Sequence, residues 1–341
     1  MNDKPLLIGY VGTKDLERMK EEDIRALTGI NIAFGTVHDD VVVWKGEHTR
    51  DALARIRQIN PEIQIILSVG GWSAGGFSEA AATEEGRATF ATSAAAIIND
   101  YELDGLDIDW EYPTIPAAGI GASPEDRQTF TYLLQTCRDE LDKLPGKRPL
   151  LTIAAGSGPY WCKNTEMEKV TPLLDYVQIM TYDMSNGYGH VTGHHTNLYQ
   201  PAEAQKESSA ELSVQDFLDH GVPAEKIVIG AAFYSHWFQG VEDDGDGYLA
   251  TAEVAGTHGP DYDQIMNDYI GKNGYERYWD DVAKAPWIYN GENFITYDDE
   301  ESLDHKIQYV KDQGLLGIMY WEYGCAIEHS LTQVMRKQID G

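Results

Sequence analysis

Several carboxylates lie close together in the segment DGLDIDWEYP, residues 104–113. Within it, Asp107, Asp109 and Glu111 alternate with large apolar side chains. Because side chains in a strand point alternately to its two faces, these acids would share one face, about 6.6 Å apart. The sequence from 100 to 116 contains no basic residue that could neutralise them. We therefore predict a buried ladder of acids, in which desolvation and mutual repulsion raise at least one pKa.

A carboxylic acid with a raised pKa suits general acid catalysis near neutral pH. Glycosidic bond cleavage is the commonest reaction that requires such an acid to protonate a leaving oxygen. A purely structural role and metal binding are the alternatives, since carboxylates are also hard oxygen ligands. A serine nucleophile lacks its usual G-x-S-x-G segment. We expect glycosidic chemistry, with neither a metal nor a cofactor.

The elements that must position the ladder recur along the chain. Short apolar runs lie at residues 6–11, 30–35, 63–71, 105–109, 149–156, 176–183, 226–234 and 317–321. Stretches of helical period separate most of them, at residues 15–28, 48–60, 84–101, 126–144, 213–220 and 299–313. This alternation predicts a TIM (β/α)8 barrel, with an open doubly wound sheet as the alternative. In a barrel, Glu111 would lie at the carboxyl end of its strand, where the active site opens.

The gap between the seventh and eighth apolar runs is about eighty residues, more than one helix and two loops require. Residues 237–294 are rich in turn-forming residues, Tyr and Trp. We predict a small α+β insertion there, which walls one side of the barrel mouth. The catalytic barrel would then comprise residues 1–236 and 295–341.

Composition restricts the partners of the protein. The chain of 341 residues has 56 Asp and Glu against 26 Lys and Arg, a formal net charge of -30. Such a charge repels phosphate backbones and anionic lipids, so we expect no nucleic acid or membrane partner, and a monomer. We interpret Cys137, Cys162 and Cys325 as free thiols. No export signal is visible, which leaves a cytoplasmic protein, if Met1 is native, or a secreted one whose leader was removed.

The segment DGLDIDWEYP resembles the DxxDxDxE signature of glycoside hydrolase family 18, the chitinases. Other segments also resemble family motifs, namely AFG at 33–35, SVGGWS at 68–73, QIMTYDM at 178–184 and MYWEY at 319–323. The resemblance spans about residues 5–338, and the aromatic-rich block resembles the chitinase insertion domain. It implies a chitinase that hydrolyses β-1,4 bonds between N-acetylglucosamine units of chitin or chito-oligosaccharides.

The resemblance also implies substrate-assisted retention, in which the 2-acetamido oxygen of the sugar attacks its own anomeric carbon. Glu111 would protonate the glycosidic oxygen. Asp109 would orient the acetamide N–H, and Asp107 would exchange a proton with Asp109. Tyr182 would donate its hydroxyl to the acetamide oxygen.

Further residues are implied as substrate-binding. Asp183 would bond the distorted sugar, Met180 would line the pocket of the acetamide methyl group, and Trp321 would form the floor beneath the cleaved sugar. Trp72 would stack on the sugar of the leaving-group side.

The remaining implied residues lie around the lower part of the ladder. Ser68 would assist the lower aspartates, while Gly70 and Gly71 would let the backbone pass close to them. Tyr10 and Phe34 come near the ends of the first two strands. They would either contact the sugar or pack beneath it.

Other substrates and functions remain as alternatives. An endo-β-N-acetylglucosaminidase acting on N-glycans or peptidoglycan would use the same chemistry, whereas a sugar-binding lectin would not need Glu111. The chain departs from the family pattern at residues 184–188, which read MSNGY where many relatives have a His-Gly pair. His194 and His195 follow, and without a third ligand motif we expect them to structure a loop.

Overall fold

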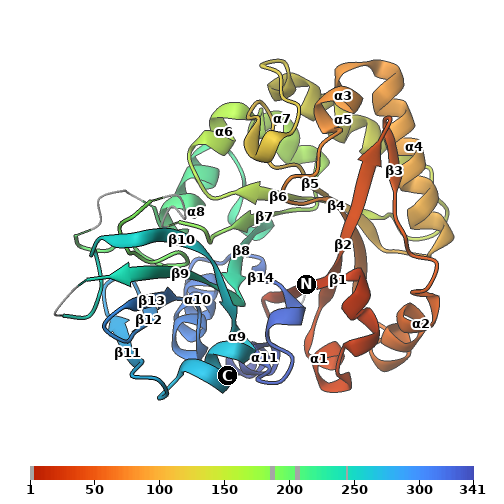
Figure 1. Cartoon of the computed structure of the whole chain (residues 1–341). Helices are drawn as coiled ribbons and strands as arrows, with labels where there is room; N and C mark the ends of the chain where they lie inside the picture. Colours follow the sequence, from red (N-terminus) through yellow and green to blue (C-terminus); the bar gives the residue numbers. More distant parts are fainter. Residues whose placement is uncertain (1–3, 185–188, 204–207, 243–244) are drawn as a thin grey trace.

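A computed structural model describes residues 4–184, 189–203, 208–242 and 245–341, so most of the departure at 184–188 lies outside the described residues. The barrel strands are β1 Leu6–Gly12, β2 Gly29–His38, β4 Gln64–Gly70, β5 Gly105–Asp109, β6 Leu150–Gly156, β7 Tyr176–Met180, β8 Ile227–Ala232 and β14 Gly317–Trp321. Neighbouring strands are parallel, and β1 pairs with both β2 and β14, which closes the sheet. The predicted TIM barrel is confirmed, and the open-sheet alternative is wrong (Figure 1).

Helices surround the barrel (Figure 1). They are α1 Glu21–Ala26, α2 Arg50–Ile59, α3 Phe77–Ala82, α4 Glu84–Asp100, α5 Asp126–Leu141, α6 Tyr160–Asn164, α7 Met167–Val170, α8 Ala210–Asp219, α10 Glu300–Asp312 and α11 Leu331–Asp340. The short α9 Tyr262–Gln264 belongs instead to the segment inserted between β8 and β14. Side chains that cap the N-terminal ends fix where some of these helices begin. Thr83 accepts a hydrogen bond from the Gly86 N–H at 2.9 Å before α4, and Asp299 forms a capping box with Ser302 before α10.

The strands are apolar because both faces of a parallel barrel sheet are covered. All five residues of β5 are buried, although two of them are aspartates. The apolar face of this segment points towards the helices, where Trp110 stacks on Phe77 of α3 with ring centroids 5.4 Å apart and contacts Phe130 of α5 edge-on. The acidic face points into the barrel.

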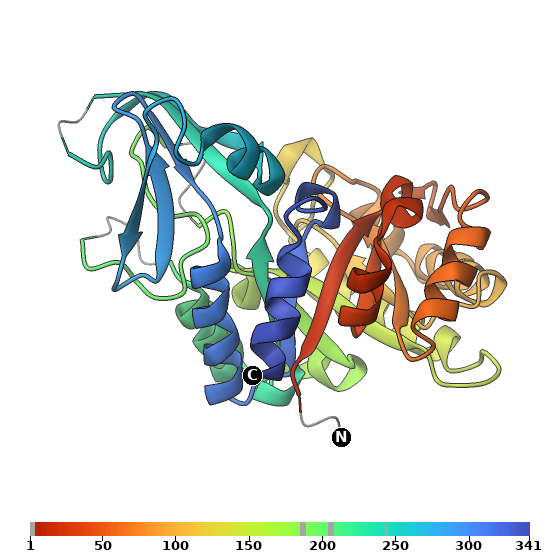
Figure 2. The same ribbon diagram turned by 90° about the horizontal axis from the view of Figure 1, so that it is seen from below.

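An antiparallel sheet of five strands lies between β8 and β14 in the sequence. Its strands are β9 Tyr234–Val241, β10 Ala252–Asp261, β11 Glu276–Asp280, β12 Ala285–Tyr289 and β13 Asn293–Thr296, in the spatial order β10-β9-β13-β12-β11. Figures 1 and 2 show this inserted sheet to one side of the barrel. Its own small core includes Phe238, Trp287 and Phe294. Only Phe233 separates β8 from β9, so a barrel strand continues almost directly into the inserted sheet.

A buried ion pair marks the return from the inserted sheet to the barrel. Lys306 of α10 lies 2.6 Å from Asp298, and both side chains are fully buried. Asp298 also accepts hydrogen bonds from Thr196 and from the Ala232 N–H at the end of β8. The pair therefore connects α10, the loop after β7 and β8, and each charge has the polar partners that burial requires.

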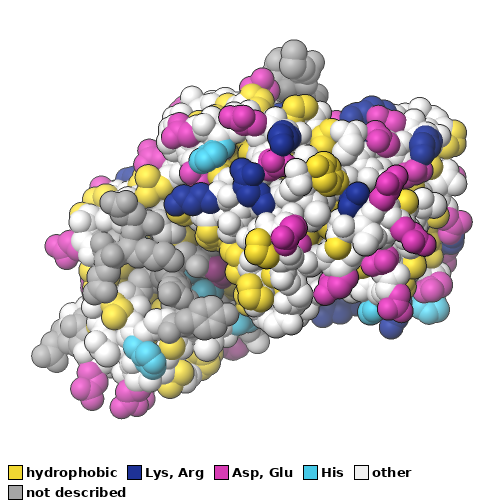
Figure 3. All heavy atoms as spheres, turned by 90° about the horizontal axis from the view of Figure 1, so that it is seen from above, with side chains coloured by type: hydrophobic (Ala, Val, Ile, Leu, Met, Phe, Trp, Pro, Cys, Tyr) yellow, Lys and Arg dark blue, Asp and Glu magenta, His cyan; other side chains and the backbone are white. Residues whose placement is uncertain are grey.

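Charges are spread over the surface. Figure 3 shows Asp and Glu side chains distributed across one face of the molecule, with Lys and Arg among them. Among the helices of the described ranges, none combines the length and the apolar character needed to cross a bilayer.

Candidate active site

Asp107 forms the base of the acid ladder and accepts four hydrogen bonds. Tyr10 and Ser68 donate to its Oδ2 at 2.9 and 2.7 Å, and Thr152 and Gln178 donate to its Oδ1 at 2.7 and 3.1 Å. These donors come from β1, β4, β6 and β7, so they converge from around the barrel interior. Burial raises the pKa of Asp107, but the four donors oppose this and favour the carboxylate. None of these four bonds joins Asp107 to Asp109.

Asp109 lies at the end of β5, with only 4% of its surface exposed. Its Oδ1 is buried and has no hydrogen-bond partner among the described residues. Burial, the charge of Glu111 and the charge of Asp107 raise its pKa well above the ordinary value. We infer that Asp109 holds a proton in the free protein more readily than Asp107 does.

Gly70 packs directly against the backbone of Asp109. Its φ is +126°, and a Cβ at this position would come within 1.9 Å of the Asp109 carbonyl oxygen. The neighbouring Gly71 donates its N–H to the same carbonyl at 2.9 Å, and its Cβ would meet the ring of Phe34 at 2.6 Å. The glycine pair therefore allows β4 and its following loop to lie close to the ladder.

Glu111 follows β5 and is 8% exposed. Burial raises its pKa to about 7; an interaction with Tyr112 partly opposes the rise, and the charge of Asp183 adds to it. Within the described part of the chain, no Lys or Arg forms an ion pair with any of the three ladder acids. Glu111 is thus a carboxyl group that still holds its proton near neutral pH, as a general acid must.

Tyr182 and Asp183 follow β7. Tyr182 is 8% exposed, and burial followed by the charge of Asp109 raises its pKa well above the ordinary value, so its hydroxyl remains a donor. Met180, at the end of β7, is 9% exposed. The end of β7 and the residues directly after it therefore bring an apolar side chain, a phenol and a carboxylate to the acid ladder.

Asp183 is held by side chains of the inserted sheet. The Tyr234 hydroxyl donates to its Oδ1 at 2.5 Å, and His236 Nε2 lies 2.7 Å from the same oxygen. Desolvation opposes ionisation of Asp183, but the interactions with His195 and His236 hold its pKa well below the ordinary value. Its side chain is 57% exposed, so it remains open to solvent as a carboxylate.

Aromatic side chains surround the acids. Trp321, at the end of β14, stacks on Phe34 with ring centroids 5.3 Å apart and packs against Tyr10 at 5.7 Å. Tyr10 is only 2% exposed, so the structure favours packing beneath the site for this residue. Trp72 is 53% exposed and meets Tyr112, the residue after Glu111, edge-on at 6.5 Å, so much of its ring is open to solvent.

Among the described residues, two groups of side chains bring potential metal ligands close together, namely Asp183, His195 and His236, and Cys162, Asp216 and His220. In the first group, the imidazole rings stack 4.4 Å apart at 16°. The lone pairs of imidazole lie in the ring plane, so those of two stacked rings do not converge on one ion. In the second group, burial raises the pKa of Cys162, and His220 Nδ1 lies 2.7 Å from the Asp216 carbonyl oxygen. Neither group presents a convergent ligand set.

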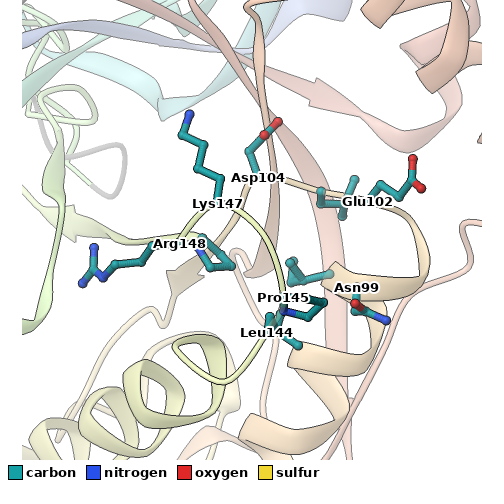
Figure 4. Close-up of a pocket in the computed structure, with 10 residues that line it drawn as sticks. Asn99, Glu102, Asp104, Leu144, Pro145, Lys147 and Arg148 are labelled. Carbon is teal, nitrogen blue, oxygen red and sulfur yellow. The ribbon is translucent and has the colours of Figure 1, made fainter.

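A hollow at the other end of the barrel is unrelated to these acids. Figure 4 shows residues that line it, including Asp104, Lys147 and Arg148. They precede β5 and β6, at the amino ends of these strands, whereas Glu111 follows the carboxyl end. Asp104, the first acid of DGLDIDWEYP, is bound there by Arg57 at 3.0 Å and therefore does not belong to the ladder.

Sequence reasoning did not single out several residues of this site. Thr152 and Gln178 lie in predicted strands, and their only signal was a polar side chain within an apolar run. Tyr234 and His236 had no local signal, because they reach Asp183 from more than fifty residues away. The adjacent His194 and His195 have different partners: His194 Nε2 bonds to Asp280 at 3.1 Å, whereas His195 faces Asp183.

Comparison with known proteins gives consistent matches. The sequence profile of "Glycosyl hydrolases family 18" matches residues 6–325. Chitinase A1 of Niallia circulans is 39% identical over 79% of this chain, and chitinase B of Serratia marcescens is 30% identical over 88%. The chain spans 42% of the length of the first relative and 73% of the second.

A solved structure also resembles the whole chain. The family 18 N-acetylglucosaminidase from Paenibacillus barengoltzii superimposes with a TM-score of 0.95 at 46% sequence identity. The superposition covers 98% of this chain and 99% of that protein.

Proposed function

Because this chain belongs to glycoside hydrolase family 18, we propose that it hydrolyses β-1,4 bonds between N-acetylglucosamine units of chitin or chito-oligosaccharides. The relatives chitinase A1 and chitinase B support this substrate class. The substrate is neutral, so aromatic faces and hydrogen bonds can bind it without positive charge on the protein.

One observation carries the proposal: Glu111 is a buried acid, with no basic partner among the described residues, whose pKa is raised to about 7. A lectin on the same barrel would have no use for such a group. A purely structural carboxylate would be expected to have a basic or fully hydrogen-bonded environment, as Asp107 has.

The reaction proposed here follows the substrate-assisted route of the family. Glu111 gives its proton to the glycosidic oxygen as the bond to the anomeric carbon breaks. The acetamido carbonyl oxygen of the same sugar forms the new bond to that carbon, which produces an oxazolinium ion. Glu111, now ionised, takes a proton from water as the water opens this ring, so the product retains the β configuration.

The ladder beneath Glu111 would support the intermediate. Asp109 would pass its proton to Asp107, accept the acetamide N–H with the Oδ1 that lacks a partner among the described residues, and as a carboxylate balance the positive charge. Asp107, fixed by its four donors, would exchange this proton with Asp109. Tyr182 would donate its hydroxyl to the acetamide oxygen.

The surrounding residues would hold the sugars. Trp321 would form the floor beneath the cleaved sugar and Met180 would contact the acetamide methyl group. Asp183 would accept a hydrogen bond from a sugar hydroxyl. The exposed Trp72 would stack on the sugar of the leaving-group side, while the inserted sheet, predicted at residues 237–294, would wall the cleft.

A second candidate is the stepwise release of single N-acetylglucosamine units. The N-acetylglucosaminidase from Paenibacillus barengoltzii, which is similar over almost the whole of both chains, favours it. Activity on the branched N-glycans of a glycoprotein, or on peptidoglycan, has no comparable support among these relatives.

The experiment is to incubate the protein with N-acetylglucosamine oligomers of four to six units, labelled at the reducing end, and separately with a glycoprotein. Product lengths are followed by mass spectrometry and the anomeric form by proton NMR. We expect β-anomeric products from the oligomers alone. Early dimers and trimers would indicate internal cleavage, and monomers would indicate stepwise release. An unchanged oligomer, or an initial α-anomer, would contradict the proposal.

A further inference from the structure

The first strand of the inserted sheet delivers two donors to one carboxylate of the barrel. Tyr234 and His236 are two residues apart in β9, so they share a face of the strand. Both end on Oδ1 of Asp183, at 2.5 and 2.7 Å. An ionised carboxylate can only accept, so His236 Nε2 carries the hydrogen of this contact.

His236 is enclosed on its other sides. It is 7% exposed, and its ring stacks on that of His195, which is fully buried. Burial, and then the proximity of His236, lowers the pKa of His195 to about 4, so His195 is neutral at neutral pH. The titratable groups that face His236 are therefore Asp183, His195, Tyr234 and His258, the cross-strand partner of His236 in β10, with Glu111 and Tyr182 beyond Asp183.

The position of Asp183 matters to Glu111. Its negative charge is among the causes that keep the proton on Glu111. Yet more than half of the Asp183 side chain is exposed, and water would solvate the carboxylate equally well if it turned outwards. The Asp183 carboxylate must therefore be held towards Glu111 by hydrogen bonds, and those described come from Tyr234 and His236 of β9.

We propose that His236 is a positioning residue, which fixes the charge of Asp183 beside Glu111 and so preserves the proton of the general acid up to neutral pH. The proposal rests on the proposed function, because it takes Glu111 as the proton donor. It also gives the inserted sheet a second task besides walling the cleft: β9 sets the electrostatics of the catalytic acid.

The test uses three variants of the full chain. His236→Phe keeps a ring that can stack on His195 but removes the donor. His236→Gln places an amide N–H close to the position of Nε2 and restores the donor. His258→Phe is the matched control, because His258 stacks on Tyr234 at 4.9 Å but does not bond to Asp183.

The titration of Glu111 is followed by carboxyl carbon NMR in the free protein, with Glu111→Gln used for assignment. This measurement requires no substrate, so it separates the inference from the proposed function. We expect His236→Phe to lower the midpoint of Glu111 by about 0.5 to 1 pH unit, from loss of an oriented neighbouring charge. His236→Gln should restore the wild-type midpoint, and His258→Phe should leave it unchanged.

Activity provides the second readout. The falling limb of kcat/KM against pH should move to lower pH in His236→Phe by the same amount as the NMR midpoint. In the Asp183→Asn background, His236→Phe should cause no further shift, since the two residues act through one charge. An unshifted midpoint in His236→Phe, failure of His236→Gln to restore it, or an additive shift in the double variant would overturn the proposal.

Discussion

Glu111 is the residue on which the proposed chemistry depends. We expect Glu111→Gln to lower kcat/KM by about 10²- to 10⁴-fold, because the amide cannot give up a proton to the leaving oxygen. Binding of an N-acetylglucosamine oligomer should persist, because the surrounding aromatic side chains are unchanged. Steady-state kinetics and calorimetry check both parts. A variant with wild-type turnover would refute the assignment of the general acid.

Ionisation of Glu111 should lower the activity as the pH rises. The protonated form of Glu111 is the active one, so kcat/KM should fall as pH rises through about 7. Well above that value the decrease should approach tenfold per pH unit. This decrease in kcat/KM can be measured with a fluorogenic N-acetylated substrate between pH 5 and 9. A profile that stays flat to pH 9 would show that another group donates the proton.

The same pKa has a consequence for stability. A carboxyl group whose pKa is raised from 4.5 to about 7 in the folded state binds its proton more tightly there than in the unfolded chain. Its stabilising contribution is present below pH 4.5 and is lost as pH rises to about 7, a change of about 3 kcal/mol. Glu111→Gln avoids this loss. Its free energy of unfolding, relative to wild type, should therefore rise between pH 4.5 and 8 in denaturant titrations.

The ladder shows which residues of a site a sequence can reveal. Alternation of acids and apolar residues in one strand predicted which acids share a face, because that pattern is local. The donors to Asp107 come from other strands, and their partnership depends on barrel closure. Similarly, His195 and His236 meet Asp183 only through the tertiary structure, so neighbouring His194 gave no indication of this arrangement.

Elements of regular pattern were predicted most completely. Each of the eight apolar runs corresponds to a barrel strand, since burial on both faces leaves a continuous apolar signal. The predicted helical stretches correspond to α1, α2, α4, α5, α8 and α10. Helix α11 was not predicted, although Leu331, Met335 and Ile339 recur at helical spacing and are buried. The short α3, α6 and α7 have 6, 5 and 4 residues, too few to show a helical period in the sequence.

At the scale of elements, the Lys306–Asp298 pair should stabilise the junction between α10, β8 and the loop after β7. Lys306→Met leaves a buried carboxylate without its counterion, and we expect a loss of about 3–5 kcal/mol in the free energy of unfolding. Urea denaturation measures it. Lys311→Met, an exposed position on the same helix, is the control and should change stability by less than about 0.5 kcal/mol. Equal effects of both variants would show that the junction does not depend on the pair.

At the scale of the whole molecule, the net charge of -30 should affect stability and binding differently. Added salt screens the repulsion between surface carboxylates, so the Tm should rise between low and physiological ionic strength. A neutral N-acetylglucosamine oligomer experiences little of this field, and its kcat/KM should stay constant within about twofold. Thermal scans and kinetics across a NaCl series test both. A steep fall of kcat/KM with salt would instead indicate that charge attraction recruits the substrate.

The connections between barrel and inserted sheet have a further consequence. On the outgoing side, the Phe233 N–H bonds to the Trp321 carbonyl oxygen at 2.7 Å, and its ring stacks on Tyr320 at 4.1 Å. Where the chain returns from the inserted sheet to the barrel, the buried ion pair joins Asp298 to Lys306 of α10. These contacts anchor both crossings and hold the inserted sheet in one position against the barrel. A sugar chain would therefore meet the inserted sheet already in place, and its binding would not require the sheet to close.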